Sequence, residues 1–232
     1  RVKTAHFPNV AMDFKQPPGA RQAVESVHRL VEHGQMIRRP ALSEVELLDF
    51  PGVGTLEAFN TDGLRSLFHT LDAPYMAEKT LRYPGHADLM RVFRESGFLN
   101  TSPIDVRGMQ VRPIDLTSKL LFEQWKLEPG QQDLTVLQVV VEGYKGDTRT
   151  TYTYDLLDRY VAETGTTSMA RTTGYTCAIV ARQVARGLYT EKGISPPEYL
   201  GRVEACYQDL VAEHKKRGIC ITETLTVHEP NA

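Results

Sequence analysis

Residues 134–154, LTVLQVVVEGYKGDTRTTYTY, are the clearest guide to the fold of this chain. Their first part, 134–141, is an almost continuous run of apolar and mostly β-branched residues, which is typical of a central strand. A polar turn at 143–147 follows, and threonine then alternates with tyrosine up to residue 154. Two strand patterns joined by a short turn predict an antiparallel β-hairpin.

Helix and strand patterns surround this hairpin in irregular order. Helical spacing of apolar residues predicts helices over 20–32, 64–71, 87–96, 115–125, 173–186 and 196–217. Alternating patterns predict strands over 41–50, 55–59 and 219–227. In the helix over 87–96, the expected buried stripe is Leu89, Val92 and Phe93. Because helices and strands do not alternate regularly, the expected fold class is α+β with a mixed, largely antiparallel sheet, not a doubly wound parallel sheet.

The composition is that of an ordinary folded protein. Of 232 residues, 41% are hydrophobic and 24% charged, and the net charge is −2. This charge balance argues against nucleic acid as a partner, and no apolar run reaches the roughly 18 residues of a membrane span. Cys177, Cys206 and Cys220 lack disulfide or metal spacing, which favours reduced thiols and a cytoplasmic location. The start at Arg1, without an initiator methionine or a signal-peptide pattern, indicates a processed or truncated chain.

A first polar segment, Asn60-Thr61-Asp62, lies between the strand predicted over 55–59 and the helix predicted over 64–71. Asn60 or Thr61 is expected to cap that helix, and Asp62 in its first turn suits the helix dipole. The free N–H groups of a helix start also form a natural seat for a carboxylate ligand. Plain capping, without a binding role, is the alternative interpretation.

A second polar segment, residues 79–86 (KTLRYPGH), precedes the helix predicted over 87–96. Lys79 and Arg82 are cations that can bind a carboxylate, and arginine can do so through two hydrogen bonds. His86 is a candidate proton carrier near neutral pH. The alternative is a solvated basic loop that ends in a histidine cap. No histidine pair has metal-ligand spacing, so no metal is expected.

Three motifs, in this order, resemble the catalytic domain of the saccharopine dehydrogenase family, and most closely its lysine 6-dehydrogenase branch. They are residues 56–62 (LEAFNTD), 79–85 (KTLRYPG) and 169–174 (MARTTG). Ser195-Pro196-Pro197-Glu198 and Gly218-Ile219 also fit the last helix and strand of that domain. Residues 1–40 are then expected to be an irregular lead-in or link from a missing cofactor domain. Residues 41–232 are expected to form the substrate-binding and dimerisation domain.

The resemblance implies an open mixed sheet with helices on one face and a subunit interface on the other, in a homodimer. It implies NAD- or NADP-dependent oxidation of the CH–NH group of lysine, a small amino-acid substrate. No G-x-G-x-x-G turn occurs in the sequence, so the cofactor is expected to be bound mainly by a domain outside this chain. The implied catalytic residues are Asp62 and His86, and the implied substrate-binding residues are Asn60, Thr61, Lys79, Thr80, Arg82 and Tyr83.

Two alternative functions stay open. Saccharopine reductases resemble this chain but have Asn-Arg-Asp-Ser where it has Asn60-Thr61-Asp62-Gly63. Thr61 cannot supply the positive charge of that arginine, which favours a smaller substrate than saccharopine and leaves saccharopine reductase as the second candidate. The third candidate is a non-catalytic ligand-binding or interaction module that has lost its cofactor domain.

Overall fold

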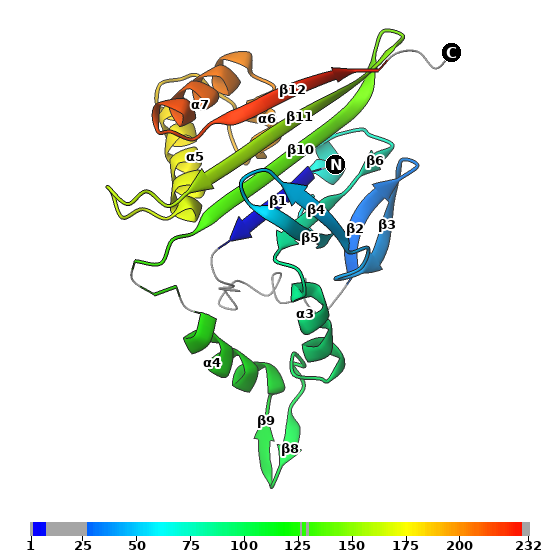
Figure 1. The fold of residues 1–232 in the computed structure, drawn as a ribbon. Helices are drawn as coiled ribbons and strands as arrows, with labels where there is room; N and C mark the ends of the chain where they lie inside the picture. The colour runs from blue at the N-terminus through cyan, green and yellow to red at the C-terminus, as the bar shows by residue number, and fades with distance from the viewer. Residues whose placement is uncertain (1, 8–26, 126, 129, 229–232) are drawn as a thin grey trace. The chain divides into compact units, whose positions relative to one another are not determined.

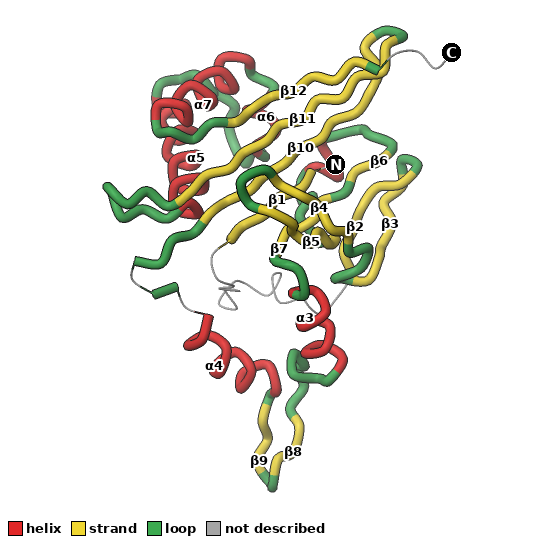
Figure 2. Tube along the Cα trace, in the orientation of Figure 1, coloured by secondary structure: helices red, strands yellow, loops and turns green. Residues whose placement is uncertain are grey.

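The computed structural model describes residues 2–7, 27–125, 127, 128 and 130–228, and it has the α+β class expected from the sequence (Figures 1 and 2). The chain divides into two compact units. Unit 1 contains residues 1–7, 65–72 and 132–232, and unit 2 contains residues 8–64 and 73–131. Both units therefore include parts of the chain before residue 41. No helix in the described part of the chain is long and apolar enough to cross a membrane.

The predicted hairpin is confirmed as the centre of unit 1. Strands β10 (Leu134–Lys145) and β11 (Thr148–Arg159) pair antiparallel from Leu134↔Arg159 to Lys145↔Thr148. β1 (Val2–Phe7) pairs with β10, and β12 (Ile221–Val227) pairs with β11, both antiparallel. β10 is longer than its apolar run, because residues 142–145 beside the turn also join the ladder. β11 continues past Tyr154 to Arg159, at the end of the hairpin away from the turn.

Two long helices of unit 1 lie on the same side of its sheet (Figure 1). They are α5 (Ser168–Ala185) and α7 (Glu204–Lys216); the short helices are α2 (Leu67–Thr70) and α6 (Pro197–Gly201). Thr167 caps α5 by accepting the N–H of Ala170 at 3.2 Å, as an N-cap threonine should. The helix predicted over 196–217 is therefore interrupted, since the chain leaves helical geometry at Val203, the N-cap of α7.

Unit 2 contains two groups of antiparallel strands and a separate hairpin. The first group has neighbouring strands β4 (Glu46–Phe50), β5 (Gly54–Asn60) and β7 (Glu78–Arg82). The second has the order β3 (Gln35–Pro40), β2 (Val27–Glu32) and β6 (Tyr75–Met76). The hairpin joins β8 (Ile104–Val106) to β9 (Met109–Val111). The helix predicted over 20–32 is wrong for 27–32, which form β2, and its earlier residues lie outside the described part.

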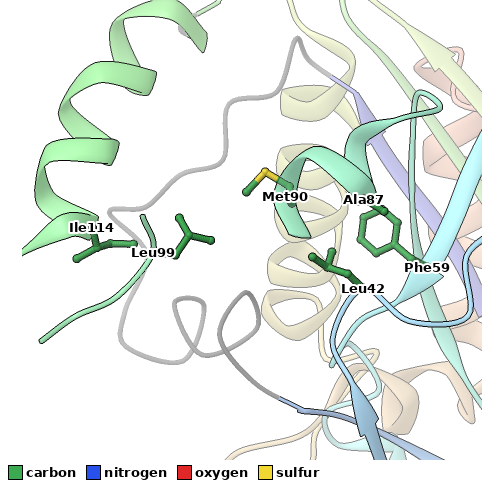
Figure 3. Packing of buried hydrophobic residues seen from close by; sticks show 6 residues of the cluster. All are labelled: Leu42, Phe59, Ala87, Met90, Leu99 and Ile114. Atoms are coloured by element: carbon green, nitrogen blue, oxygen red, sulfur yellow. The ribbon is translucent and has the colours of Figure 1, made fainter. Parts of the chain in front are cut away.

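The core of unit 2 joins α3 (His86–Glu95) and α4 (Pro113–Trp125) to strand β5 (Figure 3). Its fully buried members are Leu42, Phe59, Ala87, Met90, Leu99 and Ile114, and the partly buried Phe93, Phe122 and Trp125 pack against them. The predicted stripe on α3 is wrong in two positions, because Leu89 and Val92 are 64% and 62% exposed. The helix instead turns Ala87 and Met90 inward, and Arg94 on this side donates to the carbonyl of Ala41 at 3.0 Å.

Candidate functional site

Strand pairing brings the two polar segments together in unit 2. β5 ends at Asn60 and β7 runs from Glu78 to Arg82, and the two strands are antiparallel. Their register pairs Glu57 with Arg82, Phe59 with Thr80, and Asn60 with Lys79. The sequence predicted a helix start after each segment. The second segment leads directly into α3, as predicted, whereas after the first segment the short helix α2 begins only at Leu67.

The register also divides the predicted site residues between the two faces of the sheet. Side chains alternate along a strand, and directly paired residues project to the same face. Glu57, Phe59, Thr80 and Arg82 therefore share one face, which we call the relay face. Asn60 and Lys79 project to the other face.

Lys79 and Asn60 are buried and bonded to a short stretch before β5. The ammonium of Lys79 donates to the carbonyl of Glu44 at 2.9 Å and lies 3.1 Å from a carboxylate oxygen of Glu46. Nδ2 of Asn60 donates to Oε2 of Glu44 at 2.6 Å. Asn60 therefore does not cap a helix as predicted. The first helix after it, α2, has Ser66 at its N-cap and only four residues.

Asp62 makes a two-pronged ion pair with Arg29 of β2. Nε of Arg29 donates to Oδ1 at 2.9 Å and Nη2 donates to Oδ2 at 2.7 Å. Oδ1 also accepts the backbone N–H of Arg29 at 3.2 Å. This geometry fixes the loop after β5 against β2, since paired hydrogen bonds of this kind restrain both position and orientation. Both Asp62 oxygens thus already hold a cation within the protein.

Thr61, Glu78 and Thr80 form a connected polar group on the relay face. Oε2 of Glu78 accepts the hydroxyl of Thr61 and, at 3.0 Å, the backbone N–H of Gly63. The hydroxyl oxygens of Thr61 and Thr80 lie 2.8 Å apart. Glu78 is buried, whereas Thr61 and Thr80 are half-buried. The group therefore places a carboxylate behind two hydroxyls that are nearer the surface.

Arg82 and Tyr83 lie at the far end of the same segment. Nη1 of Arg82 donates to the carbonyl of Leu81 at 2.8 Å, and burial lowers the pKa of the guanidinium, which the charge of Glu78 partly offsets. An arginine remains charged at neutral pH even so. Tyr83 is 53% exposed. Of the two cations predicted to hold a carboxylate, only Arg82 lies on the relay face.

His86 is the first residue of α3, directly after Gly85, whose φ of 97° is the left-handed conformation that favours glycine. Burial, with a further contribution from the charge of Arg82, lowers the pKa of His86 to about 4. The prediction that His86 exchanges a proton near neutral pH is therefore wrong for this environment. A neutral imidazole can still accept one hydrogen bond and donate another.

Sequence reasoning missed two buried glutamates, Glu57 and Glu78. Glu57 is 4% exposed, and its carboxylate accepts the backbone N–H groups of Gly85, at 2.8 Å, and of Ala87. It thereby caps α3 from a neighbouring strand. A usable signal existed for Glu57, which stands between Leu56 and Ala58 in a mostly apolar strand, where a charged residue needs a partner. The strand of Glu78 reads EKTLR and gives no such signal.

Comparisons with known proteins agree with this fold. The chain belongs to the saccharopine dehydrogenase family, since the Saccharopine dehydrogenase C-terminal domain matches residues 16–219. The chain is 27% identical over 173 residues to the carboxynorspermidine synthase of Vibrio cholerae, covering 72% of this chain and 42% of that protein. It is 33% identical over 103 residues to the Schizosaccharomyces pombe saccharopine dehydrogenase [NADP(+), L-glutamate-forming], covering 44% of this chain and 22% of that protein.

A solved structure has the same fold. The apo saccharopine dehydrogenase (L-Glu forming) from Saccharomyces cerevisiae matches with a TM-score of 0.70 and 17% identity, over 97% of this chain and 66% of that one. The chain spans less than half the length of the two curated relatives, the carboxynorspermidine synthase and the S. pombe saccharopine dehydrogenase. Both relatives are enzymes of the oxidoreductase or synthase type.

Proposed function

We propose that this chain is the substrate-binding domain of an NAD(P)-dependent oxidoreductase that acts on a carbon–nitrogen bond of an amino acid, in the manner of lysine 6-dehydrogenase. Family membership supports the enzyme class. One observation carries the substrate class: the relay face holds Arg82 together with the carboxylate-backed hydroxyls of Thr61 and Thr80. A cation and an anion on one face suit a substrate that carries both charges.

The residues of the relay face divide the work in this proposal. Arg82 binds the substrate carboxylate through its guanidinium, and Thr80 receives the amine. His86, neutral at pH 7, accepts or donates a hydrogen bond beside them and does not serve as a strong base. Asp62 acts indirectly, since its pairing with Arg29 holds the loop that carries Thr61.

The cofactor would be held by a part of the protein outside this chain. Within the described residues, no glycine-rich turn joins a strand to a helix in the way that dinucleotide binding requires. When bound, NAD or NADP supplies the hydride acceptor or donor for the carbon–nitrogen bond. This domain supplies the position of the amine and the exclusion of water around it.

Two further candidates differ in substrate. The match to a carboxynorspermidine synthase favours an enzyme whose product is a carboxylated polyamine, because it covers most of this chain. The match to a saccharopine dehydrogenase favours saccharopine. A non-catalytic ligand-binding module is the remaining candidate.

A panel of turnover assays on the full-length protein separates these candidates. Oxidation would be followed by NADH or NADPH absorbance with L-lysine, with saccharopine and with carboxynorspermidine. We expect L-lysine to have the highest kcat/KM, and Thr61→Arg to lower it relative to saccharopine. Preference for another substrate would select the corresponding candidate. Ligand binding without any turnover would select the non-catalytic module.

We also propose that the protein is a homodimer. Unit 2 exposes apolar side chains on both long helices, with Leu89, Val92, Leu116 and Leu120 all more than half exposed. Exposed apolar residues in this density usually mark an interface. Light scattering of the full-length protein at micromolar concentration should give the mass of a dimer, and a monomer mass would contradict the proposal.

A further inference from the structure

The hydrogen bonds among Thr61, Glu78 and Thr80 have a direction. Oε2 of Glu78 accepts the N–H of Gly63 and also the hydroxyl proton of Thr61. A threonine hydroxyl has only one proton to donate. The 2.8 Å contact between the Thr61 and Thr80 oxygens must therefore use the proton of Thr80. The chain of donors runs from Thr80 to Thr61 to Glu78.

This direction determines what the half-buried end of the chain offers to a ligand. The proton of Thr80 is committed to Thr61, so its oxygen presents lone pairs and no donor. A ligand carboxylate would find no hydrogen bond there and would face the negative charge of Glu78 behind it. An ammonium group would find an acceptor whose lone pairs are strengthened by that charge, because hydrogen bonds in a chain polarise one another.

Gly63 provides the space that this arrangement needs. A Cβ atom at position 63 would overlap the Cγ, Cδ and Oε2 atoms of Glu78. Gly63 does not have a positive φ, so its backbone conformation is open to other residues. The glycine is needed for the close approach of the carboxylate. The carboxylate of Glu78 is thus positioned by its hydrogen bonds with Thr61 and Gly63, and the missing side chain at position 63 leaves room for it.

We propose that Glu78, acting through Thr61 and Thr80, is the specificity-determining group that makes the relay face select a substrate end bearing an ammonium over one bearing a carboxylate. Thr80 touches the substrate, and Glu78 is a positioning residue that orients the hydroxyls. The proposal rests on the proposed function only for the reaction that follows. The preference itself is a property of binding, which can be measured without turnover.

Calorimetry on the full-length protein tests the preference with two amino acids of six carbons each. L-lysine ends in an ammonium and L-2-aminoadipate ends in a carboxylate, while both offer the same α-carboxylate to Arg82. We expect L-lysine to bind at least about tenfold more tightly, the scale of one charge-assisted hydrogen bond. Glu78→Gln and Thr80→Val should each weaken L-lysine binding by about tenfold and leave L-2-aminoadipate unchanged or improved.

A second threonine–carboxylate pair provides matched controls. Thr55 donates to Asp49 on strands β4 and β5, at the opposite end of β5 from Thr61. Thr55→Val and Asp49→Asn should leave both affinities unchanged. Thr80→Val leaves the hydrogen bonds of Glu78 in place, so it tests the proposal even if Glu78→Gln lowers stability. In every variant, the amide NMR signal of Gly63 reports whether the local fold persists.

The outcomes separate this inference from the proposed function. Binding of both amino acids with equal affinity, or full L-lysine affinity in Thr80→Val, would overturn the inference even if the enzyme oxidises amino acids. 1,5-Diaminopentane, which has two ammonium groups and no carboxylate, serves as the third probe. One outcome is that the diamine binds to the wild type and more weakly to Glu78→Gln and Thr80→Val, while L-lysine is neither bound nor oxidised. In that case the inference holds, and the proposal that the substrate is an amino acid is wrong.

Discussion

The ring of His86 lies stacked on the ring of Phe59, with centroids 5.9 Å apart and planes inclined by 8°. Phe59 belongs to the buried core of unit 2, so the imidazole packs against that core. The cost of placing a charged ring there is the main reason for the pKa of about 4. Packing against the core therefore controls the charge of His86, which lies against the relay face through Phe59.

Replacing Phe59 with leucine should raise the pKa of His86 from about 4 towards its ordinary 6.5, since the flat apolar partner is lost. NMR signals of the imidazole, followed against pH, measure this directly. Phe98→Leu is the matched control, because Phe98 packs on Phe93 and is 51% exposed. A wild-type His86 that titrates near 6.5 would contradict the explanation.

The same shift predicts how stability depends on pH. The pKa of His86 is lower in the folded state than in the unfolded chain, so the unfolded chain takes up the proton first as the pH falls. The contribution of His86 is therefore complete above pH 6.5 and is lost between 6.5 and about 4. Urea unfolding at pH 7, 5.5 and 4.5 should show this loss in wild type and a smaller one in Phe59→Leu.

Glu57→Gln should destabilise the protein by about 1–3 kcal/mol, because an amide can accept only one of the two N–H groups that the carboxylate holds. It also removes a negative charge from the start of α3, where the helix dipole favours one. Glu95→Gln at the other end of α3, where the side chain is 65% exposed, should change stability by less than about 0.5 kcal/mol. Chemical denaturation measures the free energy of unfolding of both variants. Equal losses in Glu57→Gln and Glu95→Gln would contradict the capping role of Glu57.

Gly63→Ala and Gly174→Ala should have opposite signs. An added Cβ at position 63 meets the Glu78 side chain, which should cost about 1–3 kcal/mol through overpacking. Gly174 lies inside α5 with nothing within 4 Å of an added Cβ, so alanine there should stabilise by about 0.5–1 kcal/mol. The melting temperatures of the two variants test this pair, and a neutral Gly63→Ala would show that Glu78 is not held closely.

Arg82→Ala in the full-length enzyme should lower kcat/KM for the amino acid by an amount equivalent to about 2–5 kcal/mol, the cost of losing a desolvated charged hydrogen bond. Arg82→Lys should restore only part of it, since lysine lacks the planar pair of donors. Arg112→Ala is the control, because Arg112 is an exposed arginine paired with Asp115. Wild-type kinetics in Arg82→Ala would contradict a role of Arg82 in substrate binding.

The parts of the fold that follow from local pattern were predictable. The hairpin of β10 and β11 combines an apolar strand, a turn and an alternating strand within one short stretch of sequence. The start of α3 after Gly85 and its end before Gly97 also follow from local chemistry. Which side of α3 is buried did not follow from local pattern, because Leu89 and Ala87 can both be accommodated in a core. The contacts of Met90 and Arg94 with the rest of unit 2 decide that Ala87 faces inward.

The candidate site was predicted as two segments but not as a geometry. The residues of both segments could be named from their chemistry, whereas their division between two faces depends on the register of β5 against β7. That register is a non-local property, set by strands about twenty residues apart. Lys79 and Arg82 look equivalent in the sequence. Only the pleat of the strand directs Lys79 to its ion pair with the half-buried Glu46 and Arg82 to the relay face.

Strand β12 also carries a consequence for the solution behaviour of the protein. It is the last strand of its sheet, and every one of its seven residues is exposed. An exposed edge strand can pair with a strand of another molecule, above all when its residues are uniformly apolar and β-branched. The sequence of β12, ITETLTV, contains a charged residue instead. Its third residue, Glu223, is hydrogen-bonded to Tyr154 of β11, and burial together with this bond raises the pKa of Tyr154 to about 12. We expect this carboxylate to make two such strand edges repel each other, as charged residues on edge strands do in other proteins, and so to oppose growth of the sheet by edge-to-edge pairing.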